Sequence, residues 1–157
     1  MRHSEYCREA PLTWQGVCDL AQKVPWFDRN PTKWADFYCA MAMKKDSLAR
    51  LVYNVSDEPV IAAVVSTMWP GVGTVENMVD PLAIIESRGG ISREIKSWLR
   101  DAMSGLKLHR LQGTMAEELW EIGLPWAEYL GFRQEGTLRA YGSGRENYKM
   151  IALVLED

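Results

Sequence analysis

YLGFRQEGTLR at residues 129–139, followed by YKMIAL at residues 148–153, is the stretch that decides the fold. Gly131 supplies the left-handed residue that commonly closes a helix. Phe132 then turns inward as a strand begins, and Gly136 leaves room for a bulge or for a closely approaching backbone. The chain is therefore predicted to finish as a short helix followed by an antiparallel pair of strands.

Working outward from this end, apolar periodicity predicts the other elements. Apolar residues recur at helical spacing in three earlier segments, most regularly between Ile91 and Leu106. Val60–Val65 is apolar on both faces, as expected for a central strand. The order is β-α-α-β-β-β-α-β-α-β-β. The expected elements are a strand at 4–10, helices at 14–24 and 31–44, strands at 51–55, 60–65 and 74–79, a helix at 91–106, a strand at 111–115, a helix opened by Pro125, and strands at 132–141 and 148–155.

Composition excludes several classes of protein. The 157 residues suffice for one domain, spanning 1–157, and the net charge of −3 provides no basic field for nucleic acid. The longest apolar run, Val60–Trp69, is too short to span a bilayer, and the N-terminus lacks the apolar core of a signal peptide. Cys7, Cys18 and Cys39 share no metal-binding spacing, which predicts neither a metal site nor a disulfide framework. We expect a cytoplasmic protein with no nucleic-acid or membrane partner.

This order of elements, together with the C-terminal stretch, resembles the GCN5-related N-acetyltransferase (GNAT) superfamily. The branch that acetylates ribosomal proteins commonly ends in LGF-x-x-EG-x-L-R and then Y-x-M, and here these letters fall at 130–139 and 148–150. The resemblance covers nearly the whole chain. It implies an α/β GNAT fold, with a twisted, mixed but mostly antiparallel sheet of six to seven strands flanked by helices. It also implies N-acetyltransferase activity with acetyl-CoA as cofactor.

The resemblance places the cofactor at the loop after the third strand of the meander. In this fold, that loop turns backbone N–H groups and a helix N-terminus toward the diphosphate of coenzyme A. The family pattern is Arg or Gln, two residues, Gly, one residue, then Gly or Ala. Here Gly90 matches, but Ser87 and Ser92 depart from it, and the same residues also fit a Gly-Gly turn that merely begins a helix. The implied cofactor-binding residues are Met78, Val79, Arg88, Gly89, Gly90, Ile91, Ser92 and Arg93, with Arg88 or Arg93 replacing the missing charge.

For the transfer, the family commonly uses a carboxylate near the third meander strand as the base and a tyrosine on the late helix as the acid. The resemblance implies Glu76 as the base, with Asp80 at the end of the same strand, although Glu76 also fits a solvated strand residue. The family's tyrosine position holds Ala127, and the asparagine that usually opens that helix corresponds to Trp120. Tyr129 is the nearest candidate phenol, but two positions rotate it by about 200° around a helix.

The 7 tryptophans are many for one core, which predicts that some are exposed. Tryptophan often anchors interfaces, so the excess indicates a protein partner, contacts between copies of the chain, or an aromatic-lined substrate groove. The segment 26–30, between the first two helices, lies where acetyltransferases of this fold carry their acceptor-specific loop.

The sequence leaves three functions open. The first is an acetyl-CoA-dependent N-acyltransferase that transfers directly, in a ternary complex, to an amine of a small molecule or of a protein N-terminus or lysine. The departures at Ser87, Trp120 and Ala127 favour a second, a catalytically inactive protein of this fold with a structural or assembly role, such as a phage virion component. The third is a regulatory module that binds coenzyme A without reacting. Titration with acetyl-CoA separates the scaffold from the other two.

Overall fold

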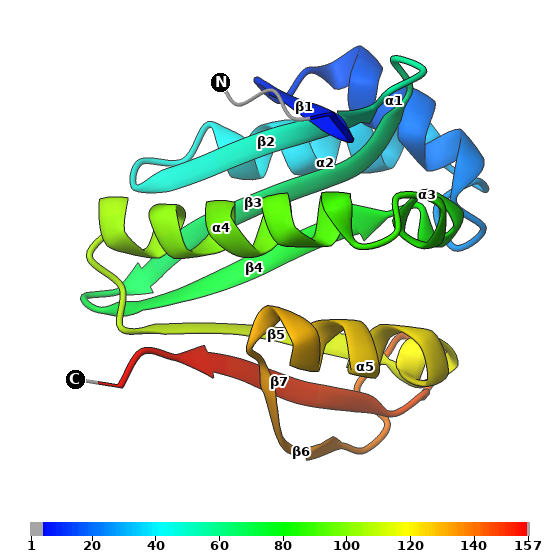
Figure 1. The fold of residues 1–157 in the computed structure, drawn as a ribbon. Coiled ribbons are helices and arrows are strands. Elements are labelled where there is room, and N and C mark those ends of the chain that lie inside the picture. Colours follow the sequence, from blue (N-terminus) through cyan, green and yellow to red (C-terminus); the bar gives the residue numbers. More distant parts are fainter. Residues whose placement is uncertain (1–4, 157) are drawn as a thin grey trace.

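A seven-stranded sheet forms the centre of the computed structural model, which describes residues 5–156 (Figure 1). The strands lie in the order β1-β2-β3-β4-β5-β7-β6, and neighbours are antiparallel except for β4 and β5. The elements are β1 (Cys7–Ala10), α1 (Trp14–Lys23), α2 (Pro31–Ala42), β2 (Ser47–Asn54), β3 (Pro59–Trp69), β4 (Val72–Val79), α3 (Pro81–Glu86), α4 (Gly90–Gly105), β5 (Arg110–Ala116), the 3-10 turn η1 (Glu117–Leu119), α5 (Trp120–Leu130), β6 (Arg133–Leu138) and β7 (Tyr148–Val154).

Local sequence signals begin the first two helices, as predicted. The Thr13 hydroxyl accepts a hydrogen bond from the Gly16 backbone N–H (3.2 Å) and caps α1. Asn30 caps α2, and Pro31 occupies its first turn, where the missing proline N–H costs no helical hydrogen bond. In each case the cap acts through neighbouring backbone, so no tertiary contact is needed to explain where the helix starts.

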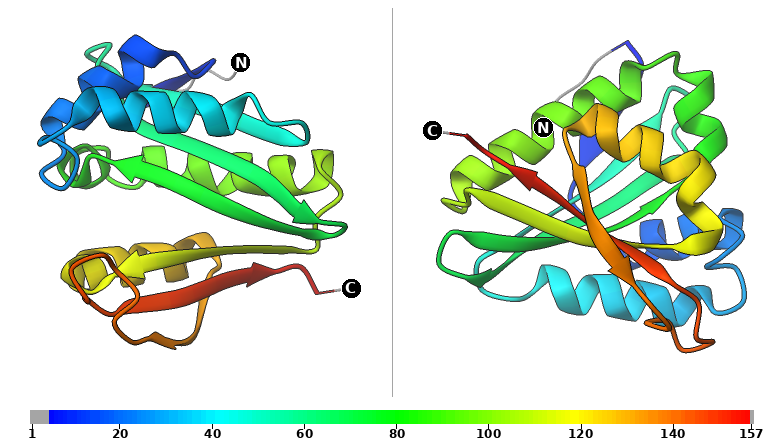
Figure 2. Two further views of the ribbon diagram at one scale, coloured as in Figure 1. Left: turned by 180° about the vertical axis from the view of Figure 1, so that it is seen from behind. Right: turned by 90° about the horizontal axis from the view of Figure 1, so that it is seen from below.

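Two apolar layers cover the sheet, with α1 and α2 on one face and α4 and α5 on the other (Figure 2). Successive side chains of a strand point to opposite faces, so each strand contributes to both layers. On β4, Met78 is fully buried in the α1–α2 layer, whereas Val75 belongs to the α4–α5 layer. Glu76 shares the face of Met78, and Asn77 shares the face of Val75.

The sheet loses its continuity between β4 and β5. These strands pair only through Val72 with Arg110, Gly73 with Leu111 and Thr74 with Gln112. Both strands continue for several residues beyond that point, and they diverge, as the left view of Figure 2 shows. The edges of β4 and β5 that face each other therefore carry backbone N–H and C=O groups without a strand partner.

Two elements differ from the sequence expectation. The helix α3 lies where only a loop was expected, because Asp80 caps it through the Leu82 backbone N–H (3.1 Å). The prediction that Pro125 opens the late helix was wrong, since α5 begins at Trp120 and Pro125 lies inside it. The preceding η1 turn starts that helix earlier, and burial of Ala127 and Leu130 against the core offsets the hydrogen bond that Pro125 cannot make.

The remaining boundaries shift by a few residues. The first strand was expected from residue 4, which lies outside the described residues, and its described part begins at Cys7.

Within residues 5–156, none of the helices has both the length and the apolar character needed to cross a membrane.

Candidate active site

A cavity of about 480 Å³ opens where β4 and β5 diverge. It reaches both layers of the fold, because residues from α2 and from the segment between α1 and α2 line it on one face and residues from α5 line it on the other, together with the two strand edges. Its lining consists of Val24, Trp26, Phe27, Trp34, Phe37, Tyr38, Val75, Glu76, Asn77, Val79, Pro81, Ile84, Ile85, Gly113, Thr114, Met115, Ala116, Leu119, Ile122, Gly123, Trp126, Ala127, Leu130, Phe132, Tyr148 and Ile151.

Four rings, here called the aromatic wall, form the α1–α2 side of the cavity: Phe27, Trp34, Phe37 and Tyr38. Consecutive rings meet edge to face, with centroids 4.8 Å apart for Phe27 and Trp34, 6.0 Å for Trp34 and Phe37, and 5.7 Å for Phe37 and Tyr38. Three of them recur on one face of α2, and Phe27 comes from the loop before it. The wall is thus a rigid apolar surface that leads toward β4.

Glu76 lies on the same side of the cavity as the aromatic wall. Its side chain is half-buried, and this burial raises the pKa of the carboxyl group above the usual glutamate range. Burial raises the pKa of the neighbouring Tyr38 phenol well above 10.0, and the charge of Glu76 adds to that shift. The pair is therefore a carboxylate with increased proton affinity beside a phenol that stays neutral.

The other two candidate catalytic residues lie outside this cavity lining. The Asp80 carboxylate caps α3, and the Tyr129 ring is 45% exposed, with the Lys96 ammonium 4.8 Å from its centroid. Ala127, two positions before Tyr129, does line the cavity. The helical rotation expected from the sequence thus separates these two side chains, and the position of the family's tyrosine faces the cavity with only a methyl group.

Tyr148 at the start of β7 is a second phenol in the cavity, and the sequence reasoning did not single it out. Burial is the main cause that raises the pKa of the Tyr148 phenol, and Glu146, Glu118 and Tyr141 raise it further. No local spacing rule brings Tyr38, Glu76 and Tyr148 together, because they come from three separate elements.

The segment Ser87–Arg93, which is here called the cofactor loop because the resemblance assigns it to the cofactor, leads the chain into α4. Arg88 and Gly89 adopt positive φ angles of 49° and 86°, and the first turn of α4 contains no acidic residue. Ser87 already occupies two donors of this turn: its carbonyl accepts from the Gly90 N–H (3.0 Å) and its hydroxyl from the Ile91 N–H (3.3 Å). The exposed guanidinium groups of Arg88 and Arg93 add positive charge at the helix N-terminus.

Gly90 and Met78 have packing roles that need no ligand. A Cβ atom at position 90 would overlap the ring of Tyr6, which lies against the glycine. Met78 is fully buried beneath α1 and α2 and is not among the cavity-lining residues, whereas Val79 is. Of the residues expected to bind the cofactor, Val79 is thus the one that lines the cavity.

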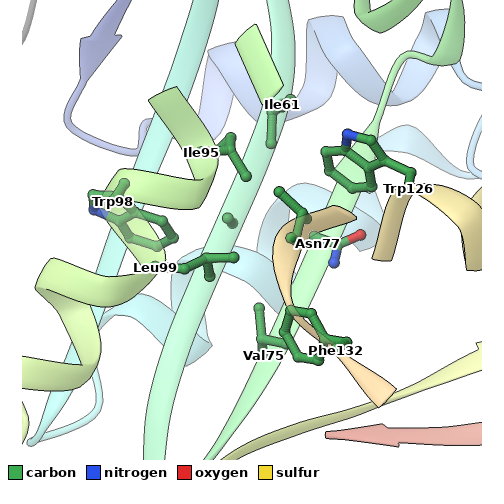
Figure 3. A pocket seen from close by; sticks show the side chains of 10 residues that line it. Ile61, Val75, Asn77, Ile95, Trp98, Leu99, Trp126 and Phe132 are labelled. Atoms are coloured by element: carbon green, nitrogen blue, oxygen red, sulfur yellow. The ribbon is translucent and has the colours of Figure 1, made fainter. Parts of the chain in front are cut away.

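Trp126 connects the cavity with the cofactor loop. Its indole lines the cavity, and its Nε1–H donates to the hydroxyl of buried Ser92 in the first turn of α4 (2.9 Å). A small void of about 20 Å³ adjoins this point on the α4 side of the sheet. Figure 3 shows the void with Ile95 and Leu99 on one side and Trp126 and Phe132 on the other. The loop and the cavity are therefore one side chain apart.

Comparison with known proteins identifies the fold. Neither a family model nor a curated protein sequence matches the chain. Among solved structures, the ribosomal-protein-S5-alanine acetyltransferase from Vibrio fischeri is similar with a TM-score of 0.72 and 14% identity, over 100% of this chain and 97% of that one. A point mutant of the spermidine N-acetyltransferase SpeG from Vibrio cholerae is similar with a TM-score of 0.71 and 14% identity, over 96% of this chain and 95% of that one. The chain has the GNAT fold.

Proposed function

We propose that the protein is an N-acyltransferase that moves the acetyl group of acetyl-CoA to an amine. The observation that carries the proposal is the cavity between diverging strands, with the half-buried carboxylate of Glu76 facing it. The similar solved structures, which are named as acetyltransferases, support the same chemistry.

The chain's groups fit the acyl-bearing end of acetyl-CoA. The facing edges of β4 and β5 offer unpaired backbone donors and acceptors, which suit an extended chain that carries amide groups. When bound, acetyl-CoA supplies the acetyl group as a thioester, so transfer forms one C–N bond, breaks one C–S bond and releases a thiol and one proton. Ala127 and Gly113 keep side-chain bulk out of this part of the cavity.

The cofactor loop fits the diphosphate end less completely. A helix N-terminus and two arginines suit an anion, but Ser87 already satisfies the N–H groups of Gly90 and Ile91. We assign the diphosphate to the guanidinium groups of Arg88 and Arg93 and to the backbone between them. The arginines replace the charge that Ser87 does not provide.

Glu76 is proposed as the general base. An amine is protonated at neutral pH and cannot attack a carbonyl carbon until it loses a proton. The raised pKa brings the proton affinity of Glu76 closer to that of an amine, which lowers the cost of this proton transfer. The neutral phenols of Tyr38 and Tyr148 and the hydroxyl of Thr114 are the other side-chain O–H groups among the lining residues described.

A catalytically inactive role for the same fold is the second candidate. The occupied donors at Ser87 and the alanine at position 127 favour it, because both remove groups that the family uses for cofactor binding and proton return. Calorimetric titration with acetyl-CoA and a thermal-shift assay separate the two. Binding followed by amine-dependent thiol release supports the enzyme, whereas no heat and no shift at millimolar acetyl-CoA supports the structural role.

A further inference from the structure

The cavity wall described here carries one negative charge and no positive charge. Among the lining residues in the described part of the chain, Glu76 is the only side chain that is charged at neutral pH. No lysine, arginine, histidine or aspartate is among them. A single half-buried carboxylate complements one positive charge on a ligand, and a second charge of either sign would find no ionic partner.

Aromatic and aliphatic side chains make up most of the surface around that carboxylate, out to the rim. The aromatic wall begins beside Glu76 with buried Tyr38, continues to Phe37, which is 40% exposed, and includes the partly buried rings of Trp34 and Phe27. At the rim, Ile85 of α3 and Ile122 of α5 line the cavity and are 69% and 60% exposed. Apolar side chains left exposed beside a cavity favour a ligand that covers them.

We propose that the acceptor is a small primary monoamine with an aromatic or bulky aliphatic body. Its ammonium group lies at Glu76, and its body packs along the aromatic wall, where the ring faces also stabilise the positive charge. This inference rests on the proposed acyl transfer for its catalytic meaning, but the binding that it predicts does not require transfer. The free amine produced at Glu76 is the nucleophile, and the proton goes to the carboxylate.

The same argument excludes two other classes of amine. A polyamine brings at least one further ammonium group into an apolar cavity without a second carboxylate. An amino acid brings a carboxylate without a lysine or arginine to pair with it. Burying an unpaired charge is costly, so each should bind at least about tenfold more weakly than the matched monoamine.

Two matched ligand pairs test the proposal in calorimetric titrations of the full chain without cofactor. Phenethylamine and phenylalanine differ only by a carboxylate, and pentylamine and cadaverine differ only by a second amine. We expect the monoamine of each pair to bind at least about tenfold more tightly. Equal affinity within either pair, or tighter binding of the second member, overturns the proposal. So does the absence of heat with both monoamines.

Variants locate the binding. Phe37 is 40% exposed, so Phe37→Ala removes a wall ring with little cost to folding and should weaken phenethylamine binding by about threefold to thirtyfold. Met43→Ala is the matched control, because Met43 is 86% exposed at the end of α2 and is not among the lining residues. Ile85→Glu adds a second carboxylate at the rim and should reverse the preference within the pentylamine–cadaverine pair. Unchanged binding in both Phe37→Ala and Ile85→Glu places the ligand elsewhere and overturns the proposal.

A separate assay keeps the two proposals distinguishable. Thiol release from acetyl-CoA is measured with the same four ligands and with a peptide that has a free N-terminus. If the monoamines bind but no acceptor releases thiol, the ligand class stands and acyl transfer fails. If thiol is released with the peptide, phenylalanine or cadaverine but not with the monoamines, acyl transfer stands and the monoamine proposal fails.

Discussion

The cofactor loop and the Glu76 side of the cavity differ in how many of their polar groups have a partner within the protein. On the cofactor side, Ser87 occupies two backbone donors, and the Trp126 indole occupies the Ser92 hydroxyl. On the acceptor side, the aromatic wall leaves Glu76 facing the cavity without an ionic partner among the lining residues described. The departures from the family pattern at Ser87 and Ser92 therefore fall where both residues already form hydrogen bonds within the protein.

This difference means that cofactor affinity and the rate of the chemical step can be considered separately. Weak cofactor contacts lower the affinity for acetyl-CoA, whereas a missing base lowers the rate after binding. A chain can lose part of its affinity for the cofactor and keep its base, because the cofactor loop and Glu76 lie on different elements.

The largest effect is expected at the acceptor side. Glu76→Gln removes the proposed base and keeps the size of the side chain, so kcat should fall by about a hundredfold or more. Thiol release with saturating acetyl-CoA measures kcat, and calorimetry should give an unchanged Kd for acetyl-CoA. Turnover equal to that of the wild type would remove Glu76 from the mechanism.

The pH profile sharpens the same point. Because burial raises the pKa of Glu76, the acid limb of kcat/KM should lie at a higher pH than an ordinary glutamate gives, falling about tenfold per pH unit. Stability changes with pH in the opposite direction to activity. Because the pKa of Glu76 is raised in the folded state, this carboxyl group stabilises the fold at low pH, and its contribution is lost as the pH rises through that pKa. The Tm of Glu76→Gln relative to wild type should therefore increase with pH. A pH-independent difference would contradict the burial argument.

A smaller effect is expected at the cofactor loop. If Arg88 and Arg93 replace the charge missing at Ser87, Arg88→Ala or Arg93→Ala should weaken acetyl-CoA binding by about tenfold to a hundredfold. Arg100→Ala provides a control, because Arg100 is also exposed but lies more than a helical turn further along α4. Whichever arginine variant binds acetyl-CoA as tightly as wild type is excluded from the site.

Ser87→Ala tests the self-capping of α4. Loss of the hydroxyl leaves the Ile91 N–H without its side-chain acceptor, so the free energy of unfolding should fall by about 1 kcal/mol. The affinity for acetyl-CoA should not fall, because the variant exposes a donor rather than removing one. Urea denaturation and calorimetry measure the two quantities, and weaker acetyl-CoA binding would show that the hydroxyl itself contacts the cofactor.

The smallest effect is expected at Tyr129. Its ring is outside the cavity lining, so Tyr129→Phe should change kcat by less than about twofold and the free energy of unfolding by less than about 0.5 kcal/mol. Steady-state kinetics with any active acceptor checks the first value. A large loss of kcat would mean that α5 rotates toward the cavity when substrates bind.

The sequence predicted the architecture well where signals were local or periodic. Thr13 and Asn30 act through their own neighbouring backbone, and the apolar faces of β3 and α4 recur at the spacing of their elements. It failed at Pro125, where a residue that usually opens a helix lies inside one. The rule for proline describes a local preference, and the packing of α5 against the core outweighs it.

The candidate site was predicted only in part. The strand that carries Glu76 was correctly placed from the pattern of its own residues, and the rotation of Tyr129 away from Ala127 followed from helical geometry. The cavity lining at Tyr38 and Tyr148, the capping by Ser87 and the contact between Trp126 and Ser92 were not predicted. Each depends on side chains from elements that are distant in sequence or on the exact path of a loop.

The sequence by itself thus determined the order of the strands and of the longer helices and the buried position of Val60–Val65, because these follow from backbone preferences and apolar periodicity, and its resemblance to the GNAT superfamily indicated the GNAT fold. Only the tertiary structure decided where β4 leaves β5, which side chains face the opening, and how far burial raises the pKa of Glu76. A side chain's surroundings depend on every element packed around it, and no single segment of the sequence contains that information.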